Sequence, residues 1–117
     1  MHEPSSKFLP LREPTFFILL GLARGEKHGY AIMQEVDALS QGRIKLSTGT
    51  LYEALARLLD QGLIERVDAL CKKPSHPGRP RKSYRLTEMG QRVLAAEIDR
   101  LRTLVTVAQQ RLQGELG

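Results

Sequence analysis

The chain has 117 residues, a formal net charge of +5 at pH 7 and a hydrophobic fraction of 41%. This length suits one domain with a single modest core, and the composition is that of a folded soluble protein rather than a disordered one. The single cysteine, Cys71, excludes an internal disulfide framework and fits a reducing compartment. No stretch of the sequence approaches the ~20 apolar residues that are needed to cross a bilayer. We therefore expect a cytoplasmic protein.

The first third of the chain is predicted to hold a flexible arm and two helices. Residues 1–11 are polar and contain prolines, which is typical of a loose terminal arm. Pro14 suits the first turn of a helix that begins near Glu13, is apolar on nearly all sides and ends at Gly25. A second helix is expected over Gly29–Leu39, where apolar residues recur at helical spacing.

A third helix, capped by Ser47 or Thr48 and ending near residue 61, has two different faces. One face carries the core residues, which are Leu51, Leu55, Leu58 and Leu59. The other face has short or hydroxyl-bearing side chains in its first turns, including those of Thr48, Gly49 and Tyr52. Such a face permits close approach to a DNA groove and a phosphate. Glu53 lies on the same face, where it either accepts a hydrogen bond from a cytosine or repels phosphates.

A basic hairpin is expected after the third helix, with strands at 63–70 and 82–86. The segment between Cys71 and Thr87, which includes the second strand, contains no Asp or Glu and carries most of the excess positive charge, on Lys72, Lys73, Arg79, Arg81, Lys82 and Arg85. A helix followed by a cationic hairpin is how a winged helix holds DNA, with the helix in the major groove and the hairpin on the backbone. Cys71, at the edge of this segment, is either a small strand residue or a redox-sensitive thiol beside two lysines.

The last predicted helix begins after Thr87 and carries a heptad seam. Its apolar residues follow one another in steps of four and three, at Leu94, Ile98, Leu101, Val105, Ala108 and Leu112. A helix over residues 88–113 would be ~39 Å long, which is more than a small winged domain can cover. We therefore expect a second copy of the chain along the seam, with Phe16 and Phe17 near the interface. The alternative is that the seam folds back on the chain's own first helix.

The ordered motifs HGYAIMQEV at 28–36, STGTLYEALARLLDQGLIE from Ser47, and a basic hairpin ending in YRLTEMG resemble those of PadR-like winged-helix transcriptional regulators. The resemblance is to the smaller subgroup with a single C-terminal dimerisation helix. It implies a mainly α fold with a small β-hairpin, divided into an arm (1–11), a winged helix-turn-helix domain (12–87) and the dimerisation helix (88–117). Carried over by position, the implied DNA contacts are Ser47, Thr48, Gly49, Thr50 and Tyr52 in the recognition helix, Arg79, Arg81 and Lys82 in the wing, and Tyr30 in the second helix.

These observations predict a sequence-specific, DNA-binding transcriptional regulator, a repressor that acts as a homodimer at the nucleoid. We expect no catalytic residue, metal or cofactor, because His2, His28 and His76 have neither a paired nucleophile nor metal-ligand spacing. Some members of the resembled subgroup stack aromatic drugs on a tryptophan. This chain has no tryptophan, so the existence of a small-molecule effector is left open. The alternative function is a winged helix that binds an acidic protein.

Overall fold

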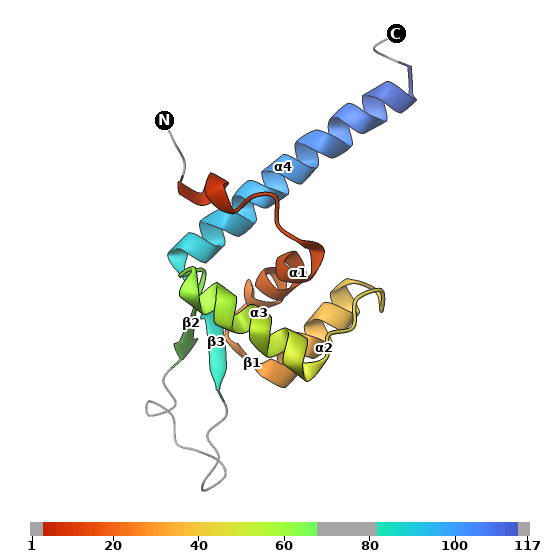
Figure 1. Cartoon of the computed structure of the whole chain (residues 1–117). Coiled ribbons are helices and arrows are strands. Elements are labelled where there is room, and N and C mark those ends of the chain that lie inside the picture. The colour runs from red at the N-terminus through yellow and green to blue at the C-terminus, as the bar shows by residue number, and fades with distance from the viewer. Residues whose placement is uncertain (1–3, 68–81, 115–117) are drawn as a thin grey trace, which may run out of the picture.

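Four α-helices and three short strands form the part of the chain that the computed structural model describes, residues 4–67 and 82–114 (Figure 1). In chain order these elements, with a preceding 3-10 turn, are η1 (Pro4–Phe8), α1 (Glu13–Leu22), β1 (Lys27–His28), α2 (Gly29–Leu39), α3 (Thr48–Asp60), β2 (Ile64–Val67), β3 (Ser83–Leu86) and α4 (Glu88–Leu112). The expected mainly α fold, a winged helix-turn-helix followed by one long helix, is confirmed.

Three of the four described helices, α2, α3 and α4, begin where a polar side chain caps the first turn. Ser47 Oγ accepts a hydrogen bond from the Thr50 N–H at 3.1 Å, and Thr87 Oγ1 accepts one from the Gly90 N–H at 3.0 Å. Gly62, with φ of +76°, turns the chain after α3, as its position in the sequence predicts. These local signals fix both ends of α3 and the start of α4.

The sheet has one strand more than the predicted hairpin. Its order is β1-β3-β2 with antiparallel neighbours, so that Lys27 lies opposite Tyr84 on one side of β3 and Ile64 lies opposite Leu86 on the other. β1 is two residues long, too short to show an alternating pattern, and it exists because β3 offers it a pairing edge. The predicted loop of the hairpin and residues 68–70 of its first strand lie outside the described residues.

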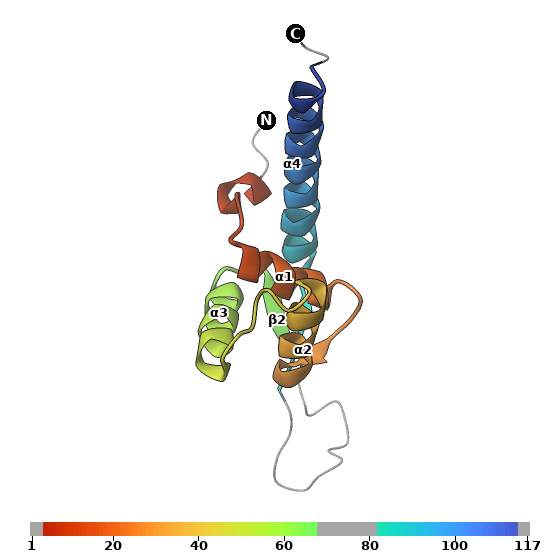
Figure 2. The ribbon, with the colours of Figure 1, turned by 90° about the vertical axis from the view of Figure 1, so that its right-hand side faces the viewer.

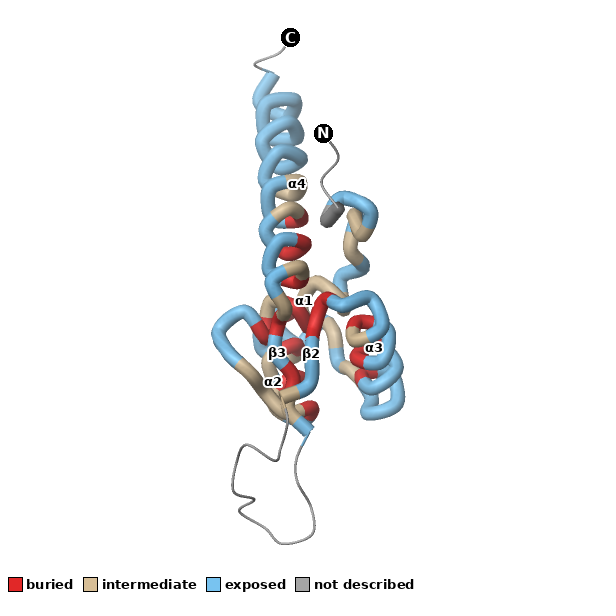
Figure 3. The backbone as a smooth tube through the Cα atoms, turned by 90° about the vertical axis from the view of Figure 1, so that its left-hand side faces the viewer, coloured by how far each residue is buried: buried red, intermediate tan, exposed pale blue. Residues whose placement is uncertain are grey.

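The core lies where α1, α2, α3, the sheet and the first turns of α4 meet (Figure 3). Three of the four leucines predicted on the inner face of α3 are buried, and Leu59 is half-buried. Phe16 and Phe17 are also half-buried, pack against the core and meet edge to face with centroids 5.6 Å apart. The fully buried large side chains are Ile18, Leu19, Leu22, Ile32, Val36, Leu51, Leu55, Leu63, Ile64, Val93 and Glu97.

The segment before α1 is packed rather than loose. Phe8, Leu9 and Leu11 are partly buried against the core, and η1 lies beside α4 (Figure 1). The Leu11 N–H donates to Glu97 Oε2 at 3.0 Å, and the Arg100 guanidinium holds the same carboxylate at 2.6 Å. The expectation of a loose arm is therefore wrong for residues 4–11, since apolar side chains and a buried carboxylate tie them to α4, while residues 1–3 lie outside the described residues.

α4 changes its surroundings along its length. Its first turns are buried in the winged domain and its second half projects away from that domain (Figure 2). Leu94, which we placed on the dimer seam, is only 6% exposed and belongs to the chain's own core, whereas Val105 is 53% exposed. The face that serves the core as far as Leu94 thus continues outward as an uncovered apolar stripe. The alternative that the whole seam folds back on α1 is wrong for this outer half.

The base of α4 approaches the sheet closely at Gly90. A Cβ atom at this position would collide with the carbonyl oxygen of Leu63 and would lie 3.2 Å from a Leu86 methyl group. The same Leu63 carbonyl accepts a hydrogen bond from the Thr87 N–H at 3.1 Å. Only a glycine leaves room for this joint between α4 and the winged domain.

Replacing Glu97 by glutamine should make the protein less stable at neutral pH by about 2 kcal/mol, because charge-assisted hydrogen bonds to a buried carboxylate are lost. The hydrogen bonds from Arg100, and then from Leu11, hold the pKa of Glu97 below its usual value although burial opposes them. A lowered folded-state pKa contributes stability above the unfolded-state pKa of about 4.3, and this contribution disappears as the pH falls through the folded-state pKa.

Denaturant unfolding of both proteins between neutral and acidic pH measures this difference. It should be full at pH 7 and should shrink as the pH falls below about 4. Asp99→Asn provides the matched control, since that carboxylate is exposed and pairs with Arg102 at 3.3 Å, so its loss should cost at most about 0.5 kcal/mol. A Glu97→Gln effect that is the same at pH 3 and pH 7 would contradict the assignment.

Candidate nucleic-acid interface

The first turn of α3 presents an exposed, small-residue surface. Ser47, Thr48, Gly49 and Thr50 are all exposed. The Ser47 hydroxyl caps the helix and also donates to Thr50 Oγ1 at 2.9 Å, so these two side chains fix each other. Nothing lies within 4 Å of the position that a Cβ of Gly49 would take. The absence of a side chain there is therefore not required by packing within the chain, and it leaves the backbone open to close approach from outside.

Three of the predicted DNA-contact residues meet in one pocket, although they are far apart in the sequence. Tyr30 from the first turn of α2, Tyr52 from α3 and Lys82, the residue before β3, line a hollow of about 290 Å³ together with His28 and Gly29. Tyr30 is 66% exposed and Tyr52 is 43% exposed. β1 leads directly into α2 and pairs with β3, and this pairing places the first turn of α2 beside the base of the wing.

Tyr52 is positioned by the absence of a side chain at Gly29. A Cβ at Gly29 would overlap the Tyr52 hydroxyl, so the phenol lies directly across the start of α2. Tyr52 thus packs against the start of α2 and is still partly exposed. Behind it, Tyr84 is 3% exposed, and burial, reinforced by the neighbouring Tyr52, raises the pKa of the Tyr84 phenol. Tyr84 therefore remains neutral at physiological pH.

The chemistry of this pocket suits an anion. Lys82 brings an ammonium group, the two exposed tyrosines bring hydroxyl donors, and none of the described residues that line the hollow is a carboxylate. The N-terminus of α2 adds the positive end of a helix dipole, with its N-cap at His28, whose Nδ1 accepts from the Ala31 N–H at 3.4 Å. A phosphate of a DNA backbone matches this set of groups in charge and in hydrogen-bonding capacity.

The other residues that the sequence analysis singled out lie outside this pocket or outside the described residues. Arg85, part of the basic segment, pairs with Glu65 across the sheet at 2.8 Å, so its charge is locally balanced. Glu53 is exposed on the same helix as Tyr52, and its role stays a prediction with two alternatives. Arg79 and Arg81, the wing contacts, lie outside the described residues, as does Cys71.

Neither a metal site nor a membrane span is found in the described ranges. Residues 4–67 and 82–114 contain no group of three or more His, Cys, Asp or Glu side chains that could hold a metal ion. Within the same ranges, no helix is long and apolar enough to span a bilayer.

Comparison with known proteins connects this geometry to a family. Two solved structures resemble the chain over most of both lengths. A PadR family transcription regulator from Clostridium difficile R20291 is 26% identical with a TM-score of 0.70, covering 86% of this chain and 99% of that one. A PadR-like transcriptional regulator from Bacillus cereus strain ATCC 14579 is 25% identical with a TM-score of 0.66, covering 85% and 90%.

A third structure, Bacillus subtilis PadR in complex with operator DNA, is 24% identical with a TM-score of 0.63 and covers 74% of this chain and 47% of that one, which shows a shared fold. No curated protein matches the chain. The model of the transcriptional regulator PadR-like family matches residues 18–96, more than half of the sequence. The chain therefore belongs to this family and is a transcription regulator rather than an enzyme, as its motifs predict.

Proposed function

We propose that the protein is a homodimeric repressor that binds a pseudo-palindromic operator through α3 and the pocket beside it. The observation that carries this proposal is the convergence of Tyr30, Tyr52 and Lys82 next to the exposed first turn of α3. Hydroxyl and ammonium donors beside a helix with a small-residue start are what a major groove and its adjoining phosphates require. A neighbour with the same fold, Bacillus subtilis PadR, was solved on operator DNA, which supports this assignment.

In this proposal the contacts divide into two classes. Thr48 and Gly49 approach the base edges, while Tyr30, Tyr52 and Lys82 hold a backbone phosphate at the edge of the same groove. Arg79 and Arg81 of the wing extend the phosphate contacts beyond Lys82. Base contacts then give specificity, and phosphate contacts give orientation and most of the salt dependence.

The second copy of the chain is proposed to lie along the outer half of α4. The helix has 25 residues, so it is ~37 Å long, and the heptad-spaced side chains on its outer half are exposed, apart from the half-buried Leu101. The stripe consists of Ile98, Leu101, Val105, Ala108 and Leu112, and the exposed Leu104 widens it. A helix of the same sequence supplies the matching apolar seam, as in a two-stranded coiled coil. Phe16 and Phe17, which pack on the core, stay as predicted neighbours of this interface.

Repression is the proposed sign of regulation, since the described elements are a winged domain and one long helix. A protein of this design acts by occupying DNA, and its place of action is the nucleoid. Two-fold symmetry predicts half-sites whose centres are separated by roughly 34–36 Å or a multiple of it.

Footprinting on the promoter next to the protein's own gene tests this function. We expect protection of two inverted half-sites, with an affinity that falls steeply between 50 and 200 mM salt as several phosphate contacts are screened. Equal binding to a shuffled duplex would refute the sequence-specific repressor. Salt-dependent binding to an acidic protein, without a footprint, would establish the alternative interaction module instead.

A further inference from the structure

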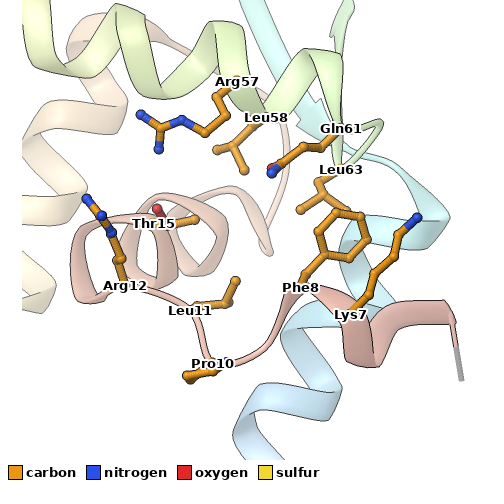
Figure 4. Close-up of a pocket in the computed structure, with 10 residues that line it drawn as sticks. All are labelled: Lys7, Phe8, Pro10, Leu11, Arg12, Thr15, Arg57, Leu58, Gln61 and Leu63. Carbon is orange, nitrogen blue, oxygen red and sulfur yellow. The ribbon is translucent and has the colours of Figure 1, made fainter.

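A second pocket lies on a different side of α3 from Tyr52. It has a volume of about 240 Å³ and lies between the segment that precedes α1, the first turn of α1 and the C-terminal end of α3 (Figure 4). Arg57, which lines it, comes five residues after Tyr52, so the two side chains leave α3 roughly 140° apart. This pocket is therefore separate from the proposed phosphate site.

The pocket has two arginines on one side and mostly apolar side chains on the other. Figure 4 shows the guanidinium groups of Arg12 and Arg57 on the same side, with the Thr15 hydroxyl between them. The other side and the floor are formed mainly by the apolar side chains of Phe8, Leu11, Leu58 and Leu63, with Lys7 and Gln61 beside them. Of these, Leu58 and Leu63 are part of the core, so the apolar wall is rigid.

The positive charge of this pocket is not balanced by the chain. Among the described residues no Asp or Glu lines the pocket, and neither Arg12 nor Arg57 forms an ion pair. The neighbouring carboxylate, Glu13, is held by two hydrogen bonds from Arg43, at 2.9 and 2.8 Å. α1 also begins here without a side-chain cap, and its dipole adds to the positive potential.

We propose that this pocket binds a small organic acid, with the carboxylate between Arg12, Thr15 and Arg57 and an aliphatic or alicyclic body against Phe8, Leu58 and Leu63. Two guanidinium groups and a hydroxyl match a carboxylate in charge and in donors. The volume lies just below the ~300–1,000 Å³ of sites for drug-sized ligands, which limits the ligand to a small molecule. A DNA phosphate would satisfy the arginines but would leave the apolar wall unfilled.

Occupancy of the pocket would connect two parts of the regulator. Arg57 belongs to α3, the helix that is proposed to read DNA. Leu11 belongs to the segment before α1, and its N–H donates to Glu97 Oε2 of α4 at 3.0 Å. A bound acid therefore joins the end of the reading helix to the element proposed to dimerise. This regulatory consequence rests on the proposed function, but binding of the acid does not, and it can be measured on the protein without DNA.

The test uses ¹⁵N-labelled full-length protein titrated with hexanoate and cyclohexanecarboxylate, up to about 10 mM so that even a millimolar Kd is detected. The expected result is a saturable shift of the amide signals of Leu11, Thr15 and Gln61 with at least one acid. Arg12→Gln and Arg57→Gln should each raise its Kd about tenfold or more, since each removes a charge-assisted hydrogen bond. Arg24→Gln, which removes an exposed charge beyond the other end of α1, should leave the Kd unchanged.

Neutral amides of the same acids and acetate provide the ligand controls, because the former lack the charge and the latter lacks the apolar body. Weaker binding of both supports the proposal. Equal binding of the amides, shifts located elsewhere, or no saturable shift with either acid would overturn it. It would also be overturned if Arg12→Gln and Arg57→Gln only weakened binding to duplex DNA, because the two side chains would then be phosphate contacts. If the protein binds the acid but gives no footprint on DNA, the proposed function is refuted and the proposal of an acid site still holds.

Discussion

Val105→Asp is expected to convert the protein from a dimer into a monomer and to lower its affinity for a two-half-site operator by about a hundredfold or more. Val105 is 53% exposed in the single chain and lies in the middle of the heptad stripe on α4. In the proposed dimer an aspartate at this position would be buried without a partner, at a cost of several kcal/mol. Losing the dimer also removes the gain from binding two half-sites with one particle.

The matched control for this change is Thr103→Asp. Thr103 is exposed and lies two residues before Val105, so that its side chain leaves α4 roughly 200° away, on the side opposite the stripe. Both variants carry the same added charge on the same helix. Sedimentation equilibrium should show a monomer for Val105→Asp and a dimer for Thr103→Asp. Dimers in both would show that the stripe is not the interface.

The combined change Arg79→Ala, Arg81→Ala and Lys82→Ala should weaken binding to every duplex by about a hundredfold and should flatten the salt dependence. Each lost phosphate contact reduces the slope of log affinity against log salt by about 0.9, so three contacts reduce it by about 2.7. Lys82 lines the pocket beside Tyr30 and Tyr52, which supports its role as a phosphate contact. Preference for operator over random sequence should be largely retained, because these side chains are not proposed to reach bases.

Fluorescence anisotropy at several salt concentrations, on operator and shuffled duplexes, measures both effects. A control variant with Arg92 and Arg102 replaced by alanine removes exposed positive charge from α4 instead, and its slope should match that of the unmodified protein. An unchanged slope for the wing variant would show that these residues do not neutralise phosphates. A loss confined to the operator duplex would show that they read bases.

The sequence predicted those parts of the fold that depend on neighbouring residues. Ser47 and Thr87 cap the helices that follow them, and Gly62 turns the chain after α3, because capping and a positive φ are determined within a few positions. β1 escaped prediction because two residues carry no periodicity and pair only once β3 is in place. Leu94 was assigned to the dimer seam for a related reason. The same heptad face of α4 packs in the core up to Leu94 and is exposed further along the helix, and only tertiary contacts show where burial ends.

The candidate site was predictable as a set of residues but not as an arrangement. Motif position identified Tyr30, Tyr52 and Lys82, yet nothing local in the sequence says that they share one hollow, because that depends on pairing between β1 and β3. The signal that was available was Gly29, whose missing Cβ makes room for the Tyr52 hydroxyl. The pocket around Arg12 and Arg57 had no sequence signal, since it requires the packed segment before α1.

In the proposed dimer, the close contact between Gly90 and the Leu63 carbonyl makes DNA binding sensitive to the distance between the two half-sites. With the Leu63 carbonyl directly against Gly90, α4 has no slack relative to the winged domain, and so in the proposed dimer the two reading helices are held at a set separation. One inserted base pair between half-sites would rotate one of them by roughly 35° about the duplex axis. A flexible linker would absorb such a rotation, whereas this joint would not. The length of the operator spacer should therefore matter as much to recognition as the bases themselves.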